Sequence, residues 1–179
     1  SKIEILQPII ANIILQQLSY QELIVFVVAL LLLLVSAIVS ASEIAFFSID
    51  LKSRHELEQS KKNSDKSIAR LLESPQKLLA TILITNSFFN VAVILLLTYL
   101  SNTVFEYDGS PLWAFIFQAI FITFIVLIFS EITPKLFASE KPVATATLAY
   151  PLIQILQSLF APLVSILVKS TTIVNKKLA

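Results

Sequence analysis

Long uncharged apolar runs alternate with one charged segment along the chain. Residues 23–42 carry no charged side chain. A helix rises ~1.5 Å per residue, so this run spans ~30 Å, the thickness of one bilayer core. Residues 78–100 and 112–129 are also uncharged. The pattern predicts an all-α integral membrane protein with three transmembrane helices, at about residues 23–47, 78–100 and 112–131.

The charged segment at residues 48–77 predicts which side of the membrane each loop occupies. It contains seven Lys or Arg residues, whereas residues 101–111 contain none. By the positive-inside rule, residues 48–77 are expected to form cytoplasmic juxtamembrane helices in contact with inner-leaflet lipids, and the N-terminus is expected outside. Ser48 or Asp50 is predicted to cap a short helix, and Ser74-Pro75 to begin the next one.

The two ends of the chain are less regular. Residues 1–22 mix apolar and polar positions and predict a lead-in helix at the membrane interface. Residues 142–168 are long enough to span, but Pro142, Pro151 and Pro162 are expected to break them. A crossing would also put Lys169 outside, which favours broken helices on the inner face over the alternative of a fourth span. The whole of 1–179 is predicted to form a single domain.

Composition supports a lipid environment and narrows the chemistry. Hydrophobic residues make up 56% of the chain, mean hydropathy is +0.85, and charged residues make up 14%, against ~25% in soluble domains. A net charge of +1 suggests no nucleic-acid partner. The absence of Cys excludes thiolate metal sites and thiol nucleophiles. The absence of Met, even at position 1, leads us to expect that the chain begins inside a longer product or follows removal of an N-terminal segment.

Polar residues inside the predicted spans are candidates for function, because a carboxylate there costs ~2.5–3.5 kcal/mol on insertion scales. Counted along the helices, they share one level in the inner half of the bilayer. Asn86 and Asn90 are four residues apart and face the same way. Pro134 lacks an N–H and would leave the carbonyl of Ser130 free. The candidates are Ser40, Ser42, Asn86, Asn90, Ser130 and Glu131.

These side chains supply hydroxyl, amide, carboxylate and carbonyl oxygens, a set that suits Mg²⁺ or Ca²⁺. Other interpretations stay open for each residue on its own. Serine and asparagine within spans also hydrogen-bond helices together without any ligand. Glu43 can reach the interface or pair with a lysine, and His55 in the charged segment is expected to be a solvated surface residue.

Several stretches resemble one family. They are 39–45 (VSASEIA), 71–86 (LLESPQKLLATILITN), Asn90 and 130–135 (SEITPK). At these positions the chain resembles the transmembrane domain (DUF21) of the CNNM/CorC family of magnesium transport proteins. The likeness covers residues 21–165, and the gliding-motility-associated bacterial branch is the most similar. The family often has Gly where this chain has Ala41 and Ser130.

The resemblance implies a homodimer in the bacterial inner membrane, with three spans per subunit and an inward-facing acidic cavity. It implies Mg²⁺ binding by Ser40, Asn86, Asn90 and Glu131, with Ser42 and the Ser130 carbonyl as additional ligands. Family members usually continue into a cytoplasmic pair of CBS domains that bind ATP. ATP is therefore expected only through such domains, which this chain does not reach before Ala179.

Three functional hypotheses follow. The first is a multi-pass Mg²⁺ transport domain that works by efflux or exchange. The second is a membrane scaffold for a motility or secretion complex, in which the polar residues only hold helices together. An intramembrane enzyme is disfavoured, because the chain has no Cys and its single His, His55, lies outside the spans.

Overall fold

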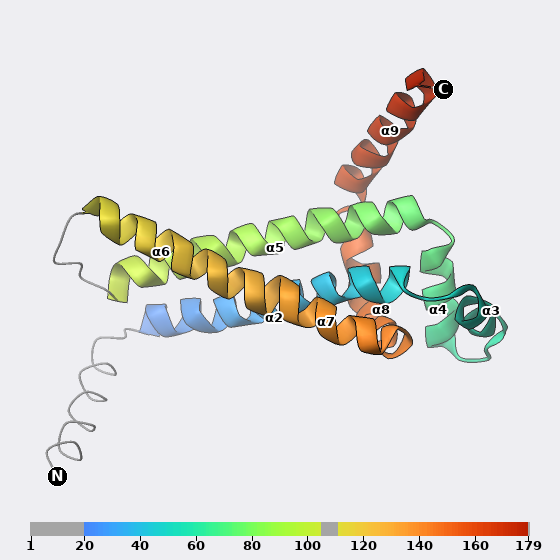
Figure 1. Ribbon diagram of the computed structural model, residues 1–179, viewed down its shortest axis with the longest axis horizontal. Helices are drawn as coiled ribbons and strands as arrows, with labels where there is room; N and C mark the ends of the chain where they lie inside the picture. Colours follow the sequence, from blue (N-terminus) through green and yellow to red (C-terminus); the bar gives the residue numbers. More distant parts are fainter. Residues whose placement is uncertain (1–19, 105–110, 179) are drawn as a thin grey trace, which may run out of the picture.

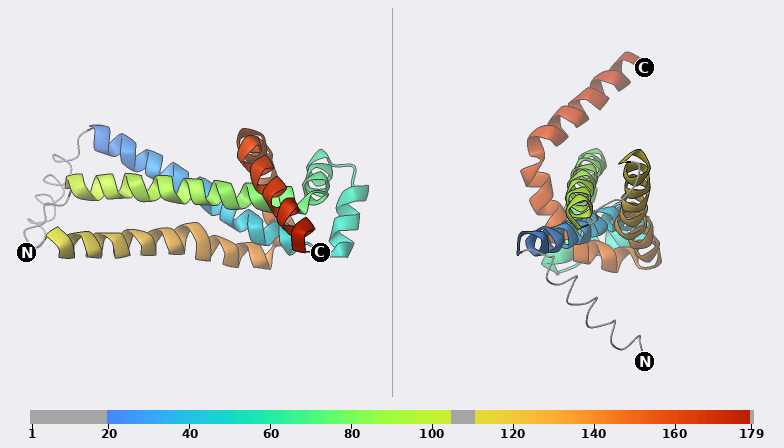
Figure 2. Two further views of the ribbon diagram at one scale, coloured as in Figure 1. Left: turned by 90° about the horizontal axis from the view of Figure 1, so that it is seen from above. Right: turned by 90° about the vertical axis from the view of Figure 1, so that its left-hand side faces the viewer.

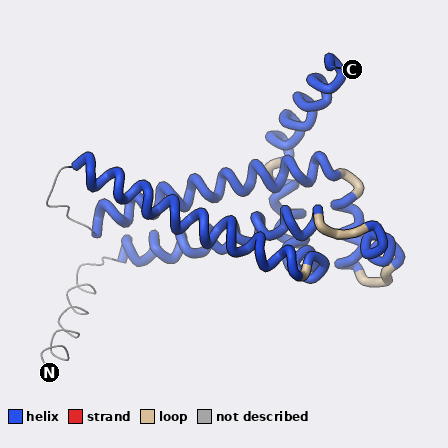
Figure 3. The backbone as a smooth tube through the Cα atoms, viewed as in Figure 1, coloured by secondary structure: helices blue, strands red, loops and turns tan. Residues whose placement is uncertain are grey.

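The computed structural model describes residues 20–104 and 111–178 (Figure 1). The predicted lead-in helix at 1–22 therefore lies outside the described residues, apart from Tyr20–Glu22, which belong to the first transmembrane helix. The described part of the chain consists of helices joined by short loops, without strands (Figure 3). The all-α prediction is confirmed.

Three helical segments are long and apolar enough to cross a membrane. They are α2 (Tyr20–Phe47), α5 (Pro75–Val104), and a continuous rod of α6 (Pro111–Val126), η1 (Leu127–Ile132) and α7 (Thr133–Glu140). These segments run lengthwise beside one another (Figure 1). The prediction of three apolar spans is thus confirmed, and the third helix continues past Pro134 to Glu140.

Two short helices, α3 (Leu51–Gln59) and α4 (Asn63–Leu72), lie at one end of the bundle (Figure 2). The predicted cap is confirmed, because a carboxylate oxygen of Asp50 accepts a hydrogen bond from the Ser53 backbone N–H at 3.2 Å. Hydrogen bonds from the Ser53 side chain and backbone hold the pKa of Asp50 below its usual value. The predicted helix start at Pro75 is confirmed as well.

The C-terminal segment forms α8 (Pro142–Leu159) and α9 (Ala161–Leu178), which meet at an angle of 80°. The expected break at Pro151 is wrong, because this proline lies inside α8. A helix can keep an internal proline when the freed carbonyl finds another partner or bends away. Pro142 and Pro162 instead occupy the first turns of α8 and α9, where proline is favoured. Together the two helices are long and apolar enough for one broken span or a re-entrant loop. Their location on the inner face and the alternative of a fourth span therefore both stay predictions.

Helix α2 is the centre of the fold, because it contacts α5, η1, α7 and α8. Its second half presents small buried residues, Ser40, Ala41, Ser42 and Ala45, to these neighbours. Small side chains let membrane helices approach closely. This close approach brings polar side chains of α2, α5 and η1 within hydrogen-bonding distance of one another.

Candidate cation site

A cluster of polar side chains joins the three spans. The Ser36 hydroxyl of α2 lies 2.6 Å from the side-chain oxygen of Asn90 and 3.1 Å from that of Asn86, both on α5. The Ser130 hydroxyl of η1 lies 2.6 Å from the Ser36 hydroxyl and 2.7 Å from the Asn90 oxygen. We call Ser36, Asn86, Asn90, Ser130 and Glu131 the polar cluster.

Glu131 fixes how Asn90 is oriented. A carboxylate only accepts hydrogen bonds, so the Asn90 amide nitrogen must face it, and this nitrogen donates to Glu131 Oε1 at 2.7 Å. The Asn90 oxygen consequently points at the two serines. Each serine hydroxyl has one hydrogen, so two hydrogens are shared among four oxygen–oxygen contacts. The hydroxyl and amide oxygens of the cluster can therefore accept more hydrogen bonds than the two hydroxyl hydrogens can supply.

Ser40 lies next to this cluster and has no partner. It is four residues from Ser36, so both side chains lie on the same face of α2. The Ser40 side chain is fully buried, and within the described chain its hydroxyl is the single buried side-chain oxygen or nitrogen without a hydrogen bond. Leaving a buried hydroxyl unpaired costs ~1–3 kcal/mol, so its persistence suggests a ligand.

The other buried hydroxyls nearby use their hydrogen within their own helix. Ser42 donates to the Val39 carbonyl at 2.6 Å and is not brought into the cluster. Thr81 donates to the Lys77 carbonyl at 2.8 Å, and Thr85 bonds in the same way to the Thr81 carbonyl. Of the six predicted site residues, four therefore lie in the polar cluster, Ser40 lies beside it, and Ser42 lies apart.

The segment that carries Ser130 and Glu131 is a π-helix, where we expected α-helical spacing. The Thr133 N–H donates to the Ile128 carbonyl, five residues back. If this spacing continued through Pro134, the proline would leave the Phe129 carbonyl without a donor, whereas α-helical spacing would leave the Ser130 carbonyl without one. Ser130 joins the cluster through its side-chain hydroxyl. A π-helical turn in a membrane span frequently marks a functional site.

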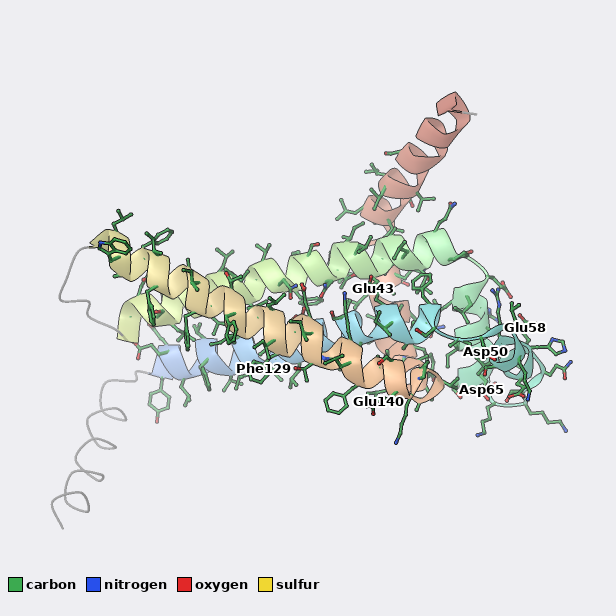
Figure 4. All side chains as sticks on the ribbon, viewed as in Figure 1. Glu43, Asp50, Glu58, Asp65, Phe129 and Glu140 are labelled. Atoms are coloured by element: carbon green, nitrogen blue, oxygen red, sulfur yellow. The ribbon has the colours of Figure 1, made fainter. Side chains whose placement is uncertain are left out.

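A salt bridge lies close to the cluster. Lys135 Nζ is 2.9 Å from Glu43 Oε2, and both side chains are about two-thirds buried, with 33% and 27% exposed. The alternative in which Glu43 pairs with a lysine is therefore confirmed. In Figure 4, Glu43 lies along the bundle, whereas Asp50, Glu58 and Asp65 gather at the end formed by α3 and α4.

These charges describe the environment that a cation would meet. Glu43, Lys135 and Glu131 together carry a net charge of −1. In the described ranges no group of three His, Cys, Asp or Glu side chains is close enough to hold a metal. A cation bound here would be held mainly by neutral oxygens and one carboxylate, so binding would be weak and reversible.

Sequence reasoning missed one member of the cluster. Ser36 is fully buried and contacts Asn86, Asn90 and Ser130. A single serine in an apolar helix usually packs against a neighbouring helix and does not by itself indicate a site. Its four-residue spacing from Ser40 was the signal that could have identified it.

Three apolar spans around a partly buried, oxygen-rich cluster define a multi-pass helical membrane protein with a candidate cation site. The chain belongs to the CNNM family, because residues 27–179 match the Cyclin M transmembrane N-terminal domain. This match confirms the resemblance noted from the sequence motifs. The family is a transporter-type membrane family associated with Mg²⁺ transport.

Two curated relatives support this membership. A UPF0053 protein from Haemophilus influenzae is 27% identical over 139 residues, which are 78% of this chain and 32% of that protein. The UPF0053 inner membrane protein YfjD of Escherichia coli is 29% identical over 134 residues, 74% of this chain and 30% of that protein. The chain thus spans about a third of the length of these relatives. It is a multi-pass inner membrane protein.

Proposed function

We propose that this domain transports Mg²⁺ by efflux or exchange, and that the ion binds between α2, α5 and η1. The ligands would be Ser40 together with Asn86, Asn90 and Glu131, with the hydroxyls of Ser36 and Ser130 as additional oxygens. The observation that carries the proposal is the buried, unpartnered Ser40 hydroxyl beside a cluster that is rich in acceptors.

The chemistry of the cluster fits Mg²⁺ as a transported ion. Mg²⁺ binds oxygen ligands in octahedral geometry at ~2.0–2.1 Å. The Asn90 amide now donates to Glu131, so an arriving ion would take the Glu131 carboxylate from this donor. The same amide would then be free to donate elsewhere. The hydrogen bond between Asn90 and Glu131 would be lost when the ion binds, and this loss would offset part of the binding free energy. The ion would therefore bind weakly enough to be released.

The charges around the site would select cations. Glu131 and Glu43 outweigh Lys135, so this part of the bundle attracts positive ions. Because the charged helices α3 and α4 lie at the end that the positive-inside rule assigns to the cytoplasm, we propose that Mg²⁺ enters from that side. A homodimer, and regulation by ATP through cytoplasmic CBS domains of a longer protein, belong to the same proposal and rest on the family resemblance.

The decisive experiment compares two serines that are equally buried on the same helix. Ser40→Ala removes the unpartnered hydroxyl, whereas Ser42→Ala removes one that already donates to Val39. We expect Ser40→Ala to weaken Mg²⁺ binding about tenfold, or ~1.4 kcal/mol. Without Mg²⁺ the same variant should be at least as stable as the wild type, because an unpaired buried hydroxyl is lost.

Ser42→Ala is expected to keep wild-type Mg²⁺ affinity. Binding is measured by isothermal titration calorimetry in detergent, and the melting temperature with and without Mg²⁺ is measured in parallel. Mg²⁺ flux into proteoliposomes gives the functional result. Equal Mg²⁺ affinity and flux for Ser40→Ala and the wild type would contradict the proposed site, and no Mg²⁺-dependent stabilisation of the wild type would contradict Mg²⁺ binding altogether.

A further inference from the structure

A polar cavity lies at the beginning of α5, away from the polar cluster. Its volume is about 430 Å³, and it is bounded by the end of α4, the turn into α5 and the last turns of α8. The side chains that matter for its chemistry are Arg70, Glu73, Ser74, Lys77, Gln154 and Gln157. Lys77 precedes Asn86 by nine residues, or ~14 Å along the helix axis, so the two sites are separate.

The charged groups of this cavity are not used by the fold. Within residues 20–104 and 111–178, neither Arg70 nor Lys77 has a salt-bridge partner, and neither does Glu73. The cavity therefore carries a net charge of +1, from two cations and one carboxylate. A site with this charge is matched by a ligand with a single negative charge.

Neutral donors complete the lining. Gln154 and Gln157 are half-buried, and across the described chain their side-chain amides have no hydrogen-bond partner. Each amide offers two N–H donors and one acceptor. Beside two cations, such groups can bind phosphate oxygens and the hydroxyls or ester oxygens next to a phosphate.

The cavity lies at the border between polar and apolar surface. Directly after Lys77, α5 presents Leu79 and Leu83, which are 38% and 45% exposed. On α8, Ile155 and Leu159 are 65% and 67% exposed. Exposed leucine and isoleucine side chains in a membrane protein face acyl chains, so the cavity lies at the level of lipid headgroups. The positive-inside rule assigns this end of the bundle to the inner leaflet.

We propose that this cavity is a binding site for the phosphodiester group of an inner-leaflet phospholipid that carries one net negative charge. Arg70 and Lys77 bind the phosphate, and Gln154 and Gln157 hydrogen-bond the glycerol part of the headgroup. The acyl chains lie against the exposed apolar side chains of α5 and α8. Basic pockets between helices on the cytoplasmic side are typical headgroup sites. We call this cavity the headgroup pocket.

The inference is independent of Mg²⁺ transport and can be tested on the delipidated protein in detergent. Native mass spectrometry would count bound molecules during a titration with phosphatidylglycerol, with phosphatidylcholine, or with free glycerol phosphate. We expect one phosphatidylglycerol to be retained per chain in preference to phosphatidylcholine. Arg70→Gln and Lys77→Gln should each weaken its retention about tenfold.

Lys66→Gln is the matched control, because Lys66 is an exposed cation of the same helix α4 and does not line the cavity. It should leave lipid retention unchanged. Gln157→Leu tests the same pocket without any change of charge and should weaken retention more modestly. Melting temperatures of all variants without lipid show whether the fold is intact.

Three outcomes would overturn the inference. Retention that is equally insensitive to Arg70→Gln and Lys77→Gln would mean that lipid binds elsewhere. Equal weakening by Lys66→Gln would mean that only overall charge matters. Binding of free glycerol phosphate as tight as that of phosphatidylglycerol would identify a soluble phosphate compound as the ligand instead of a lipid.

Discussion

The polar cluster and the layer one helical turn away from it differ sharply in chemistry. On each span, a polar residue of the cluster is followed, toward the predicted outer side, by a buried or half-buried apolar residue. The three pairs are Ser36 and Leu32 on α2, Asn90 and Val93 on α5, and Ser130 and Val126 on η1 and α6. Val93, Val126 and Ile122 form a hydrophobic core, against which Leu32 packs.

For the ion binding proposed above, this contrast provides an apolar barrier directly next to the site. We call Leu32, Val93 and Val126, together with Ile122 one turn further out, the apolar layer. It offers no side-chain ligand to an ion and is tightly packed, with Val93 fully buried. The polar cluster, by contrast, is joined by hydrogen bonds and includes the half-buried Asn86, Asn90 and Glu131. In the proposed transport, an ion that enters from the inner side would therefore stop at the apolar layer.

The largest effect is expected from a change in the polar cluster. Glu131→Gln keeps the size of the side chain and removes the one carboxylate of the cluster. We expect Mg²⁺ affinity to fall about 30-fold, or ~2 kcal/mol, because a close charged contact is lost. Calorimetry measures the Mg²⁺ affinity, and proteoliposomes measure the Mg²⁺ flux, which should be lost in Glu131→Gln. Asn90→Ala should abolish the flux as well. Normal flux in both folded variants would refute the site.

A smaller effect is expected from a change in the apolar layer. Val93→Ala removes buried methyl groups from the apolar layer and leaves a small cavity, which should cost about 1.5 kcal/mol of stability. Mg²⁺ affinity should stay at the wild-type value, because the layer supplies no ligand. Thermal unfolding in detergent and Mg²⁺ titration measure the two quantities. A loss of Mg²⁺ affinity as large as that of Glu131→Gln would show that the two layers are not separable.

A smaller effect is expected at the salt bridge between Glu43 and Lys135. A double-mutant cycle with Glu43→Gln and Lys135→Gln should give a coupling energy of about 1 kcal/mol, since the pair is close but partly exposed. Each single variant also changes the charge next to the cluster. Lys135→Gln should therefore raise Mg²⁺ affinity and Glu43→Gln should lower it, and shifts in the same direction would contradict an electrostatic role.

The smallest effect is expected at the cap of α3, far from either layer. The pKa of Asp50 is lowered by its hydrogen bonds to Ser53. Its stabilising contribution is therefore present above the unfolded-state pKa and disappears as pH falls through the folded-state value. Asp50→Asn keeps the cap and should remove this acid dependence, which the melting temperature between neutral and acidic pH would show. An unchanged pH dependence would place its origin elsewhere.

The membrane spans and helix starts could be predicted from sequence because each depends on local rules. Uncharged runs of span length predicted α2 and α5, and Asp50 and Pro75 marked helix starts through capping and a fixed backbone angle. The pairing of Asn86 with Asn90 followed from helical periodicity. These features need no knowledge of neighbouring helices.

The remaining features depend on contacts between helices. Ser36 became a site candidate only through its neighbours on α5 and η1, and Ser42 proved to donate to Val39 because its rotamer turns back onto its own helix. The helical conformation around Pro151 and the π-helix before Pro134 both depend on how surrounding helices pack. The spacing of residues in the sequence cannot predict these side-chain and backbone conformations.

The π-helix also determines how the residues after it are oriented around the axis of the third span. A π-helical turn contains about one residue more than an α-helical turn. If residues 127–132 were α-helical instead, with no residue removed, every residue after them would be rotated by about 100° about the helix axis relative to α6. Lys135 would turn away from Glu43, although both residues would still be present. The single extra residue of the π-helical turn therefore sets which side of α7 faces α2.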